Sequence, residues 1–379
     1  MGSKFSKRKH KKGKYKEIEK PLENEEKEKE PSKLIVGDLK CNDFNISKIR
    51  LRTRIFSVCK YESKLKIFPN GNILIHDEKN IRIFAPKILK PLFTFLFDKI
   101  INVIILSNNS LLLTLLSPNT LISTLQIMNF SKEKTEIIEK NIYIYDGEYF
   151  LNSQKLINNI ILCYYYERID SDEKNMYYAP YEGKRPYRYN FIFYRYKNND
   201  LILEYKDSQI LTSFEENILP YEDSFFLYGN SSYEYCDIYI DLCFLYFYKN
   251  KKIKCLKDGI ENEKIKNCII YNKNNLMVLC ICPLICIIEK YSILDNDITL
   301  TSEYYIKNVD LLMKNKFNLI LMREGKKNFK YKYLDFIEVD EKFQKIKEER
   351  IIFSDFILKD ILFYKKKLYV LSDNLSIYY

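Results

Sequence analysis

The sequence predicts an all-β fold, and its composition and its pattern agree on this. Of the 379 residues, 33 are Tyr and 24 are Phe, whereas Ala, the strongest helix former, occurs only at Ala85 and Ala179. Apolar residues gather in short runs separated by Asn, Asp, Ser, Lys and Gly, which is typical of many short strands. The hydrophobic fraction of 46% is ordinary for a folded chain, so wholesale disorder, a collagen-like fibre and a coiled coil are excluded.

Residues 1–33 are predicted to be a disordered tail in front of a folded body at 34–379. Large apolar side chains are almost absent from the tail, so it cannot bury enough surface to fold. Its first half is basic and its second half, with seven Glu against four Lys, is acidic. The formal net charge of the chain is +11, and about +6 remains on the body. This is too mild to indicate a nucleic-acid groove there.

The chain begins Met1-Gly2-Ser3-Lys4-Phe5-Ser6, which matches the M-G-x-x-x-[ST] pattern for N-myristoylation at Gly2. A myristoyl chain alone gives only marginal membrane binding, so stable attachment needs a second signal. Eight basic side chains and no acid lie within residues 1–16, and we expect them to contact an anionic leaflet. These residues are Lys4, Lys7, Arg8, Lys9, Lys11, Lys12, Lys14 and Lys16. The alternatives are a solvated tail, a nuclear-localisation patch or an RNA-contacting arm.

The clearest unit of the body is Lys64 to Phe84. It contains three apolar runs separated by the turn Pro69-Asn70-Gly71 and by an Asp-Glu-Lys-Asn turn, which predicts a meander of three strands. The same pattern returns along the chain, with the second run of each unit near seven equivalent points. These points are Ile73, Leu111, Ile160, Phe225, Leu276, Leu319 and Leu368. Most separations between them match the ~40–50 residues of a four-stranded blade, so we predict a seven-bladed β-propeller.

The body resembles the WD-repeat type of β-propeller over roughly residues 50–379. The likeness is clearest in Phe68 to Ile75, followed by Ile81-Arg82-Ile83-Phe84. The resemblance implies that Phe84 stands where that family usually has the Trp of its Trp-Asp dipeptide. The chain has no Trp and no Gly-His dipeptide, so the hydrogen-bond network that locks blades in that family is absent or replaced.

Two departures from a regular repeat are expected. The long interval of the third blade contains an insertion at about residues 169–188, which is polar and rich in Tyr. Because Tyr and Arg dominate interface hot spots, this insertion is the candidate contact surface for a protein partner. The candidate contact residues are Tyr177, Tyr178, Tyr181, Arg185, Tyr187 and Arg188.

The second departure is at the end of the chain. Too few residues follow Leu368 for four strands, so we predict that a strand near Ile49 to Val58 completes the last blade and closes the ring.

No catalytic, metal or cofactor site is predicted. The ten Cys do not form a disulfide framework, and no signal-peptide core follows Met1, which points to a reducing cytoplasm. Cys280, Cys282 and Cys286 are interpreted as buried core thiols, since they lie in an apolar run without a nearby His. With two His in the chain, a His-dependent active site is hard to build. Asp77, Asp237 and Asp241 are available carboxylates, but Asp in turns and on strand surfaces is usually structural.

The longest nearly pure apolar run, Leu276 to Ile288, is shorter than the ~20 residues that a bilayer requires, so no transmembrane segment is predicted. These observations favour a peripheral, membrane-anchored propeller scaffold on the cytoplasmic face of a membrane, without enzymatic activity and without a cofactor. An RNA-associated propeller with a basic N-terminal arm is the alternative.

Overall fold

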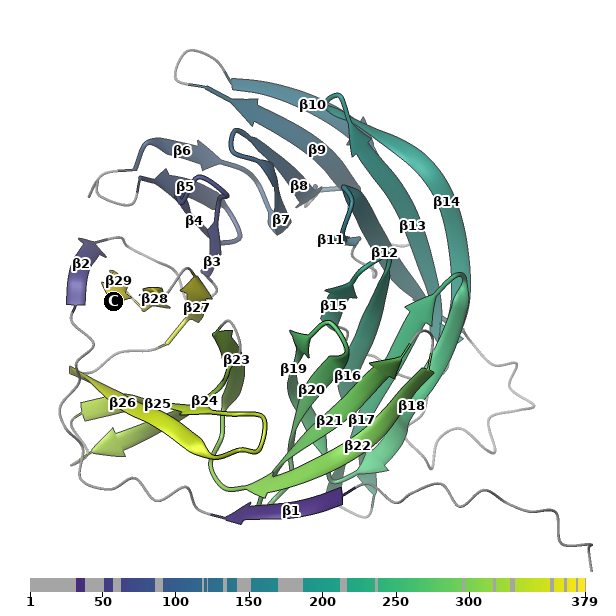
Figure 1. Ribbon diagram of the computed structural model, residues 1–379. Coiled ribbons are helices and arrows are strands. Elements are labelled where there is room, and N and C mark those ends of the chain that lie inside the picture. Colours follow the sequence, from purple (N-terminus) through teal and green to yellow (C-terminus); the bar gives the residue numbers. More distant parts are fainter. Residues whose placement is uncertain are drawn as a thin grey trace, which may run out of the picture.

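In the computed structural model the chain forms seven sheets arranged around a common axis (Figure 1). The all-β, seven-bladed β-propeller predicted from the repeat is confirmed. The structure describes residues 32–37, 51–56, 63–85, 91–117, 119–120, 122–131, 135–141, 151–169, 187–211, 217–235, 238–294, 297–315, 318–327, 331–354, 358–364, 367–372 and 374–378. Within these ranges there is no helix long and apolar enough to cross a membrane.

Each of the first four blades is a meander whose first strand lies nearest the axis and whose fourth lies at the rim. Blade 1 comprises β3 (Lys64–Ile67), β4 (Ile73–His76), β5 (Asn80–Phe84) and β6 (Phe93–Leu96). Blade 2 comprises β7 (Ile100–Ser107), β8 (Ser110–Leu116), β9 (Ser123–Phe130) and β10 (Thr135–Asn141). Blade 3 comprises β11 (Asn152–Lys155), β12 (Ile160–Arg168), β13 (Tyr187–Lys197) and β14 (Asp200–Leu211). Blade 4 comprises β15 (Asn217–Tyr221), β16 (Ser224–Tyr235), β17 (Ile238–Lys249) and β18 (Lys252–Glu261).

The last three blades follow the same order, and two of them add a strand from the N-terminal segment. Blade 5 comprises β19 (Lys264–Asn272), β20 (Asn275–Ile281), β21 (Cys286–Leu294) and β22 (Asp297–Ile306), with β1 (Ser32–Gly37) beside β22. Blade 6 comprises β23 (Leu311–Asn315), β24 (Asn318–Lys327), β25 (Tyr331–Val339) and β26 (Lys345–Ser354). Blade 7 comprises β27 (Asp360–Tyr364), β28 (Lys367–Leu371), β29 (Asn374–Tyr378) and β2 (Leu51–Phe56).

The seven equivalent points of the sequence repeat mark the same place in every blade. Each is the first or second residue of the second strand, from Ile73 at the start of β4 to Leu368 in β28. The predicted insertion joins β12 to β13 in blade 3, and its residues 170–186 lie outside the described part of the chain. Phe84, expected in place of the WD-family Trp, ends the third strand of blade 1 with its side chain buried.

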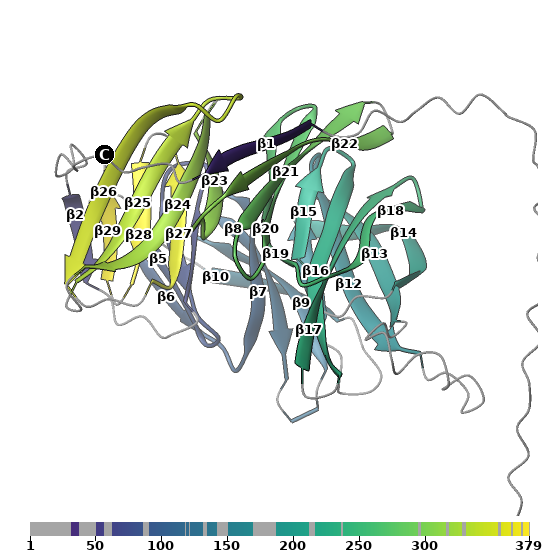
Figure 2. The same ribbon diagram turned by 90° about the horizontal axis from the view of Figure 1, so that it is seen from below.

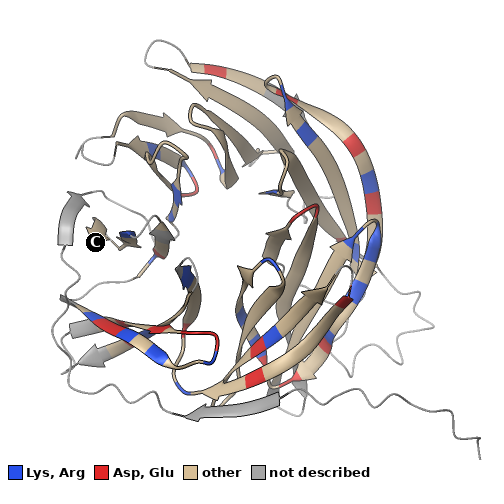
Figure 3. Ribbon diagram, viewed as in Figure 1, with Lys and Arg blue, Asp and Glu red and all other residues tan. Residues whose placement is uncertain are grey.

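Seven clusters of buried side chains fill the seven interfaces between neighbouring blades. Between blades 3 and 4 the cluster is aromatic, and Phe225 stacks on Tyr248 with ring centroids 4.8 Å apart. Such aromatic pairs add ~0.5–1.5 kcal/mol beyond the burial of their area. Both faces of each blade therefore pack against a neighbouring blade. Charged residues occur along the rim strands, for example in β14 and β26 (Figure 3).

Asparagine makes the tight turns of the long blades. Lys197 pairs with Asp200 across a two-residue loop in which Asn198 and Asn199 have φ of 52° and 61°. Positive φ at both central residues is the requirement of a type I′ hairpin, and Asn tolerates it better than other non-Gly residues. The Asn198-Asn199 break between β13 and β14 is thus a hairpin turn.

The predicted closure of the ring is confirmed. Strand β2 pairs antiparallel with β29, from Leu51 opposite Tyr378 to Phe56 opposite Asn374. The last blade therefore combines three C-terminal strands with one N-terminal strand, which hides the edge of β29.

Strand β1 was not expected. It begins at Ser32, within the predicted tail, and pairs parallel with β22 at the rim of blade 5, as both views show (Figures 1 and 2). Blade 5 consequently has five strands. The N-terminal segment thus contributes strands to the rim of the ring at two places.

Polar bridges link the inner parts of neighbouring blades. Asn267 on β19 donates through Nδ2 to the carbonyl of Leu312 on β23 at 3.0 Å and accepts from its amide at 3.1 Å. Asn230 on β16 makes the same double contact with Ile265 on β19, at 2.9 and 2.6 Å. The amide of Leu65 on β3 donates to Asp360 on β27 at 2.7 Å. Side chains that satisfy strand backbone across an interface hold the blades in register.

We expect Asn267→Ala to lower the free energy of unfolding by about 1–3 kcal/mol, because both backbone groups of Leu312 lose their partner. Chemical denaturation measures this loss. Asn274→Ala is the control, since Asn274 lies exposed in a turn of the same blade and its replacement should leave the midpoint unchanged. Equal midpoints for the two variants would contradict a bridging role of Asn267.

Candidate functional site

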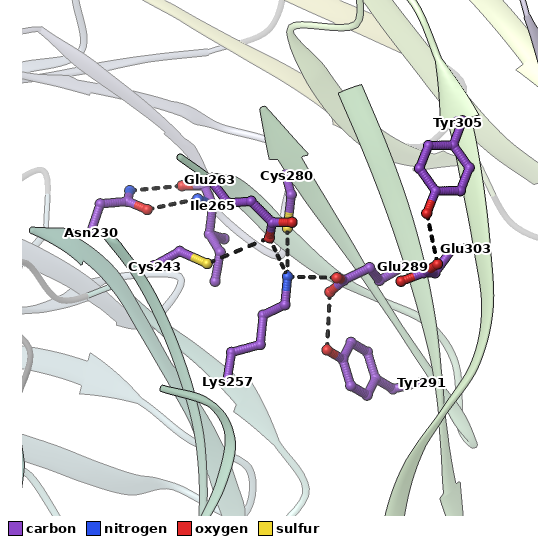
Figure 4. A network of polar contacts seen from close by, with 10 residues as sticks. All are labelled: Asn230, Cys243, Lys257, Glu263, Ile265, Cys280, Glu289, Tyr291, Glu303 and Tyr305. Carbon is purple, nitrogen blue, oxygen red and sulfur yellow. Dashed lines mark hydrogen bonds and ion pairs between the residues drawn. The ribbon is translucent and has the colours of Figure 1, made fainter. Parts of the chain in front are cut away.

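A network of buried polar side chains lies between blades 4 and 5 (Figure 4). We call it the ion cluster: Lys257, Glu263, Glu289, Cys280, Cys243 and Tyr291. The Nζ atom of Lys257 lies 2.7 Å from Oε2 of Glu263, 2.5 Å from Oε1 of Glu289 and 3.4 Å from Sγ of Cys280. An ammonium group has three N–H donors, so each has an acceptor.

The carboxylates of the ion cluster have further donors. Tyr291 donates its hydroxyl to Oε2 of Glu289 at 3.0 Å, and the thiol of Cys243 lies 3.7 Å from Oε2 of Glu263. The side chains of Lys257 and Glu289 are each 4% exposed, whereas Glu263 is 16% exposed. Burial at this level leaves an ion dependent on its partners, because water cannot replace them.

A bulge in blade 4 turns Lys257 toward blade 5. In the β17–β18 pair, Tyr246 is opposite Cys255 but Leu245 is opposite Lys257, so Leu256 is an extra residue. Lys254 and Lys257 consequently point to the same side although they are three residues apart. Lys254 reaches Asp297 of blade 5 at the exposed rim, and Lys257 enters the interface.

The acidic half of the ion cluster comes from the alternation of β21. Ile287, Tyr291 and Ile293 belong to the core between blades 4 and 5, and Glu289 shares their face of the strand. Glu263 lies in the short connection between β18 and β19, and Cys280 is on β20. Two blades and the link between them therefore supply the cluster.

The electrostatics of the ion cluster favour a charged Lys257 beside neutral thiols. Burial tends to lower the pKa of Lys257, but its sulfur and carboxylate neighbours outweigh burial and hold that pKa above its ordinary value. Burial raises the pKa of Cys280 well above its ordinary value, and the charge of Glu289 adds to this. A neutral, buried thiol is a poor nucleophile. The arrangement binds blade to blade and offers no activated group.

Three members of the ion cluster also have the spacing of metal ligands. One ligand atom each of Glu263, Cys280 and Glu289 lies within 4.8 Å of the others. The ammonium of Lys257 contacts all three residues and supplies the positive charge among them. They could hold a metal ion only if Lys257 moved away.

The three clustered cysteines of the sequence are not brought together. Cys280 belongs to the core between blades 4 and 5, whereas Cys286 belongs to the core between blades 5 and 6 and lies 3.5 Å from the carbonyl of Val309. Cys282 packs at the margin of the first of these cores. The interpretation as core thiols fits the burial of Cys280 and Cys286.

The other residues singled out from the sequence are placed as follows. Gly2 and the eight basic residues of the tail lie outside the described residues, as do Tyr177, Tyr178, Tyr181, Arg185 and Asp237. Tyr187 is buried, with its ring 5.7 Å from that of Tyr166, and Arg188 is exposed, 4.0 Å from Glu167. The assigned roles of all these residues remain predictions.

The described carboxylates named from the sequence have structural partners. Asp77 accepts from the amides of Lys79 and Asn80 at 2.8 and 2.9 Å and so holds the β4–β5 turn. Asp241 lies 3.0 Å from the ammonium of Lys264 on the neighbouring blade. These two carboxylates lie on different blades and do not converge.

Reasoning from the sequence missed the ion cluster. One signal was present: Glu289 interrupts a run of alternating apolar residues on the buried face of β21. Lys257 gave no such signal, since strict alternation from Lys254 places it on the opposite face. The bulge at Leu256 is what brings the ammonium to the acid.

No protein-family model matches this chain, and no curated protein sequence matches it. Solved structures are similar in fold. A puromycin-hydrolyzing peptidase from Mycobacterium tuberculosis matches with 7% identity and a TM-score of 0.50, over 86% of this chain and 52% of that one. An acylaminoacyl peptidase from Pyrococcus horikoshii matches with 9% identity and a TM-score of 0.49, over 82% and 49%. The WD40 domain of SCAP from fission yeast matches with 7% identity and a TM-score of 0.43, over 87% and 98%.

The chain spans about half the length of the two peptidases, at 52% and 49%. At such identities the likeness shows the fold alone. The chain is a seven-bladed β-propeller whose structural neighbours include a WD40 domain.

Proposed function

We propose that this chain is a membrane-anchored propeller scaffold that docks other proteins on the cytoplasmic face of a membrane. One observation carries the proposal: the segment after the tail is part of the ring at two places. Strand β1 lies at the rim of blade 5 and β2 closes blade 7. An anchor at the N-terminus would therefore hold the whole propeller and not a detachable arm.

The chemistry of the tail supports membrane attachment. A myristoyl chain at Gly2 supplies marginal affinity, and each Lys or Arg near an anionic leaflet adds up to ~1 kcal/mol. The eight basic side chains of residues 1–16 make this a two-signal anchor. The acidic stretch that follows serves as a spacer before β1.

A docking role is supported by the partners of the polar side chains in the ring, which hold turns and blade interfaces together. The three N–H donors of Lys257 all have partners within the ion cluster. Asp77 holds the β4–β5 turn, and Asp241 contacts Lys264 across a blade interface. A rigid ring with many connecting loops offers surfaces for partners. The Tyr-rich insertion of blade 3 and its exposed neighbour Arg188 are the proposed contact surface.

Gly2→Ala tests the anchor in eukaryotic cells. Wild type should be acylated at Gly2 by mass spectrometry and should sediment with membranes, whereas Gly2→Ala should move to the soluble fraction. Lys7→Gln/Lys9→Gln/Lys11→Gln/Lys12→Gln is the matched variant. It should keep the acyl chain but bind membranes more weakly at low salt, and its binding should fall less than that of the wild type as salt is raised.

Retention of Gly2→Ala on membranes, or a free Gly2 amine in the wild type, would overturn the anchor. Nuclear, RNase-sensitive retention that depends on the same lysines would favour the RNA-associated alternative.

Crosslinking of the wild type at the membrane, compared with Tyr177→Ala/Tyr178→Ala/Tyr181→Ala, tests the docking surface. The triple variant should lose specific neighbours while remaining on membranes.

A further inference from the structure

The strands nearest the axis are basic. Together they carry six lysines and a single carboxylate, Asp360. The lysines are Lys64, Lys66, Lys155, Lys264, Lys266 and Lys314. Charge of one sign around a common axis attracts ions of the other sign.

Blade 1 brings two of these lysines and a histidine to one face. In the β3–β4 pair, Lys64 is directly opposite His76, and Lys66 follows two residues later on the same face as Lys64. Leu65, between them, points the other way and packs in the core between blades 7 and 1. Lys64, Lys66 and His76 therefore face blade 2, where Lys66 contacts Asn102 and Val103 of β7.

The charge of Lys66 meets only neutral acceptors. Its Nζ atom donates to the carbonyl of Val103 and to Oδ1 of Asn102, the latter at 3.3 Å, both on β7. Among the described residues, no carboxylate lies within ion-pair distance of Lys64 or Lys66. Asp360 is engaged by the amides of Leu65 and Ile361. Its charge acts on Lys64 and Lys66 without a direct ion pair. Two ammonium groups thus share one face, and no carboxylate of the described residues is in direct contact with either.

His76 adds an unused polar atom at the same place. It is 4% exposed, and its Nε2 atom has no hydrogen-bond partner. Burial, then the charges of Lys66 and Lys64, lower the pKa of His76 to about 3, although Asp77 acts in the opposite direction. Burial and then Lys64 lower the pKa of Lys66 to about 8, although the charge of Asp360 acts in the opposite direction. A buried nitrogen without a partner beside repelling cations is costly unless a ligand satisfies it.

We propose that Lys64, Lys66 and His76 bind a phosphate group at the inner edge of blade 1. A phosphate supplies the missing negative charge and several acceptor oxygens for the two ammonium groups. The O–H group of a monohydrogen phosphate can also donate to the unpartnered Nε2 of the neutral imidazole of His76. The phosphate belongs either to a small soluble molecule or to a lipid headgroup, and the two sources share this chemistry.

Titration of the full chain with inorganic phosphate tests the site. The chain has two histidines, His10 and His76, so the imidazole NMR signals are few and His76→Gln assigns them. The charged groups acting on His76 are Lys64, Lys66 and Asp77, and added phosphate should raise the pKa of His76. Phosphate should also raise the melting temperature, because it binds the folded state.

Lys64→Gln/Lys66→Gln should weaken phosphate binding at least tenfold, because it removes both ammonium groups. The control is Lys264→Gln/Lys266→Gln, which removes two lysines at the equivalent place of blade 5 and should leave binding unchanged. Equal weakening by both pairs, or no shift of the His76 signal, would overturn the proposal.

The source of the phosphate is decided in two further arms. Soluble inositol trisphosphate should compete with inorganic phosphate for either source. If the natural ligand is a free molecule, Lys64→Gln/Lys66→Gln should bind phosphoinositide vesicles as well as the wild type does. If the ligand is a headgroup, binding to vesicles of phosphatidylcholine with phosphatidylinositol 4-phosphate should fall in Lys64→Gln/Lys66→Gln but not in the control pair. If neither inositol trisphosphate nor the phosphoinositide vesicles bind at this site, the proposal is contradicted, because only inorganic phosphate would then be a ligand.

Discussion

Deletion of residues 46–60 is expected to abolish the cooperative thermal unfolding of the propeller. This deletion removes β2, which covers β29 from Asn374 to Tyr378 and joins the last blade to the first. Each ladder hydrogen bond contributes ~0.5–1.5 kcal/mol, so losing the strand removes on the order of 5 kcal/mol. That is comparable to the ~5–15 kcal/mol by which folded domains are stable at all. Calorimetry or circular dichroism on heating measures the loss.

Two shorter deletions are the controls. Removal of residues 1–31 should leave the transition in place, because the predicted tail buries no surface. Removal of residues 1–37 also takes away β1, which covers the rim of blade 5 without closing the ring, so a small decrease is expected. A wild-type transition in the 46–60 deletion would contradict closure by β2.

A cleavable variant separates ring closure from expression. A protease site inserted within residues 57–62, between β2 and β3, is cut after folding. The N-terminal fragment should stay bound through the β2–β29 ladder on gel filtration and should separate in denaturant. Release in native buffer from a propeller that stays folded would count against the closing role.

The fold was largely predictable because propeller blades repeat a local pattern. Alternating apolar residues and turn residues locate each strand to within a few residues. The regular spacing of four-stranded units along the chain then indicates a ring of blades. The closing strand could be predicted from the number of residues after Leu368, which is too small for a full blade, so that a strand from elsewhere in the chain is needed. Strand β1 could not be found in this way. Its partner β22 is far away in the sequence, and a parallel pairing at a rim leaves no local turn signal.

The ion cluster shows where reasoning from alternation fails. Glu289 could have been noticed as an acid on an apolar face, but its partner required knowledge of one bulged residue, Leu256. A bulge changes which side of the strand a residue faces, and short-range sequence features do not mark it. The predicted function lies mostly in segments outside the described residues and therefore stays a prediction.

Lys257→Met is expected to lower the free energy of unfolding by about 3–5 kcal/mol. The substitution keeps the volume of the side chain but leaves Glu289 buried and Glu263 partly buried without their cation. An uncompensated buried carboxylate is costly because neither water nor a partner stabilises its charge. Chemical denaturation monitored by tyrosine fluorescence measures the change.

Lys254→Met is the matched control on the same strand. Lys254 also faces blade 5 and lies 2.6 Å from Asp297, but the two side chains are 44% and 69% exposed. Solvent and salt screen such a pair, so the denaturation midpoint should not move measurably. If both substitutions shifted the midpoint equally, burial would not be what makes Lys257 important.

The double variant Lys257→Met/Glu289→Met separates the charge of the cluster from its packing. Replacing both buried ions by apolar side chains removes the stranded carboxylate, and such replacements are often neutral or stabilising. Glu263 can still reach solvent, since its side chain is 16% exposed. The double variant should therefore recover more than half of the stability lost in Lys257→Met. Additive losses in the two single variants and the double variant would instead mean that Lys257 and Glu289 stabilise the interface by packing, independently of each other.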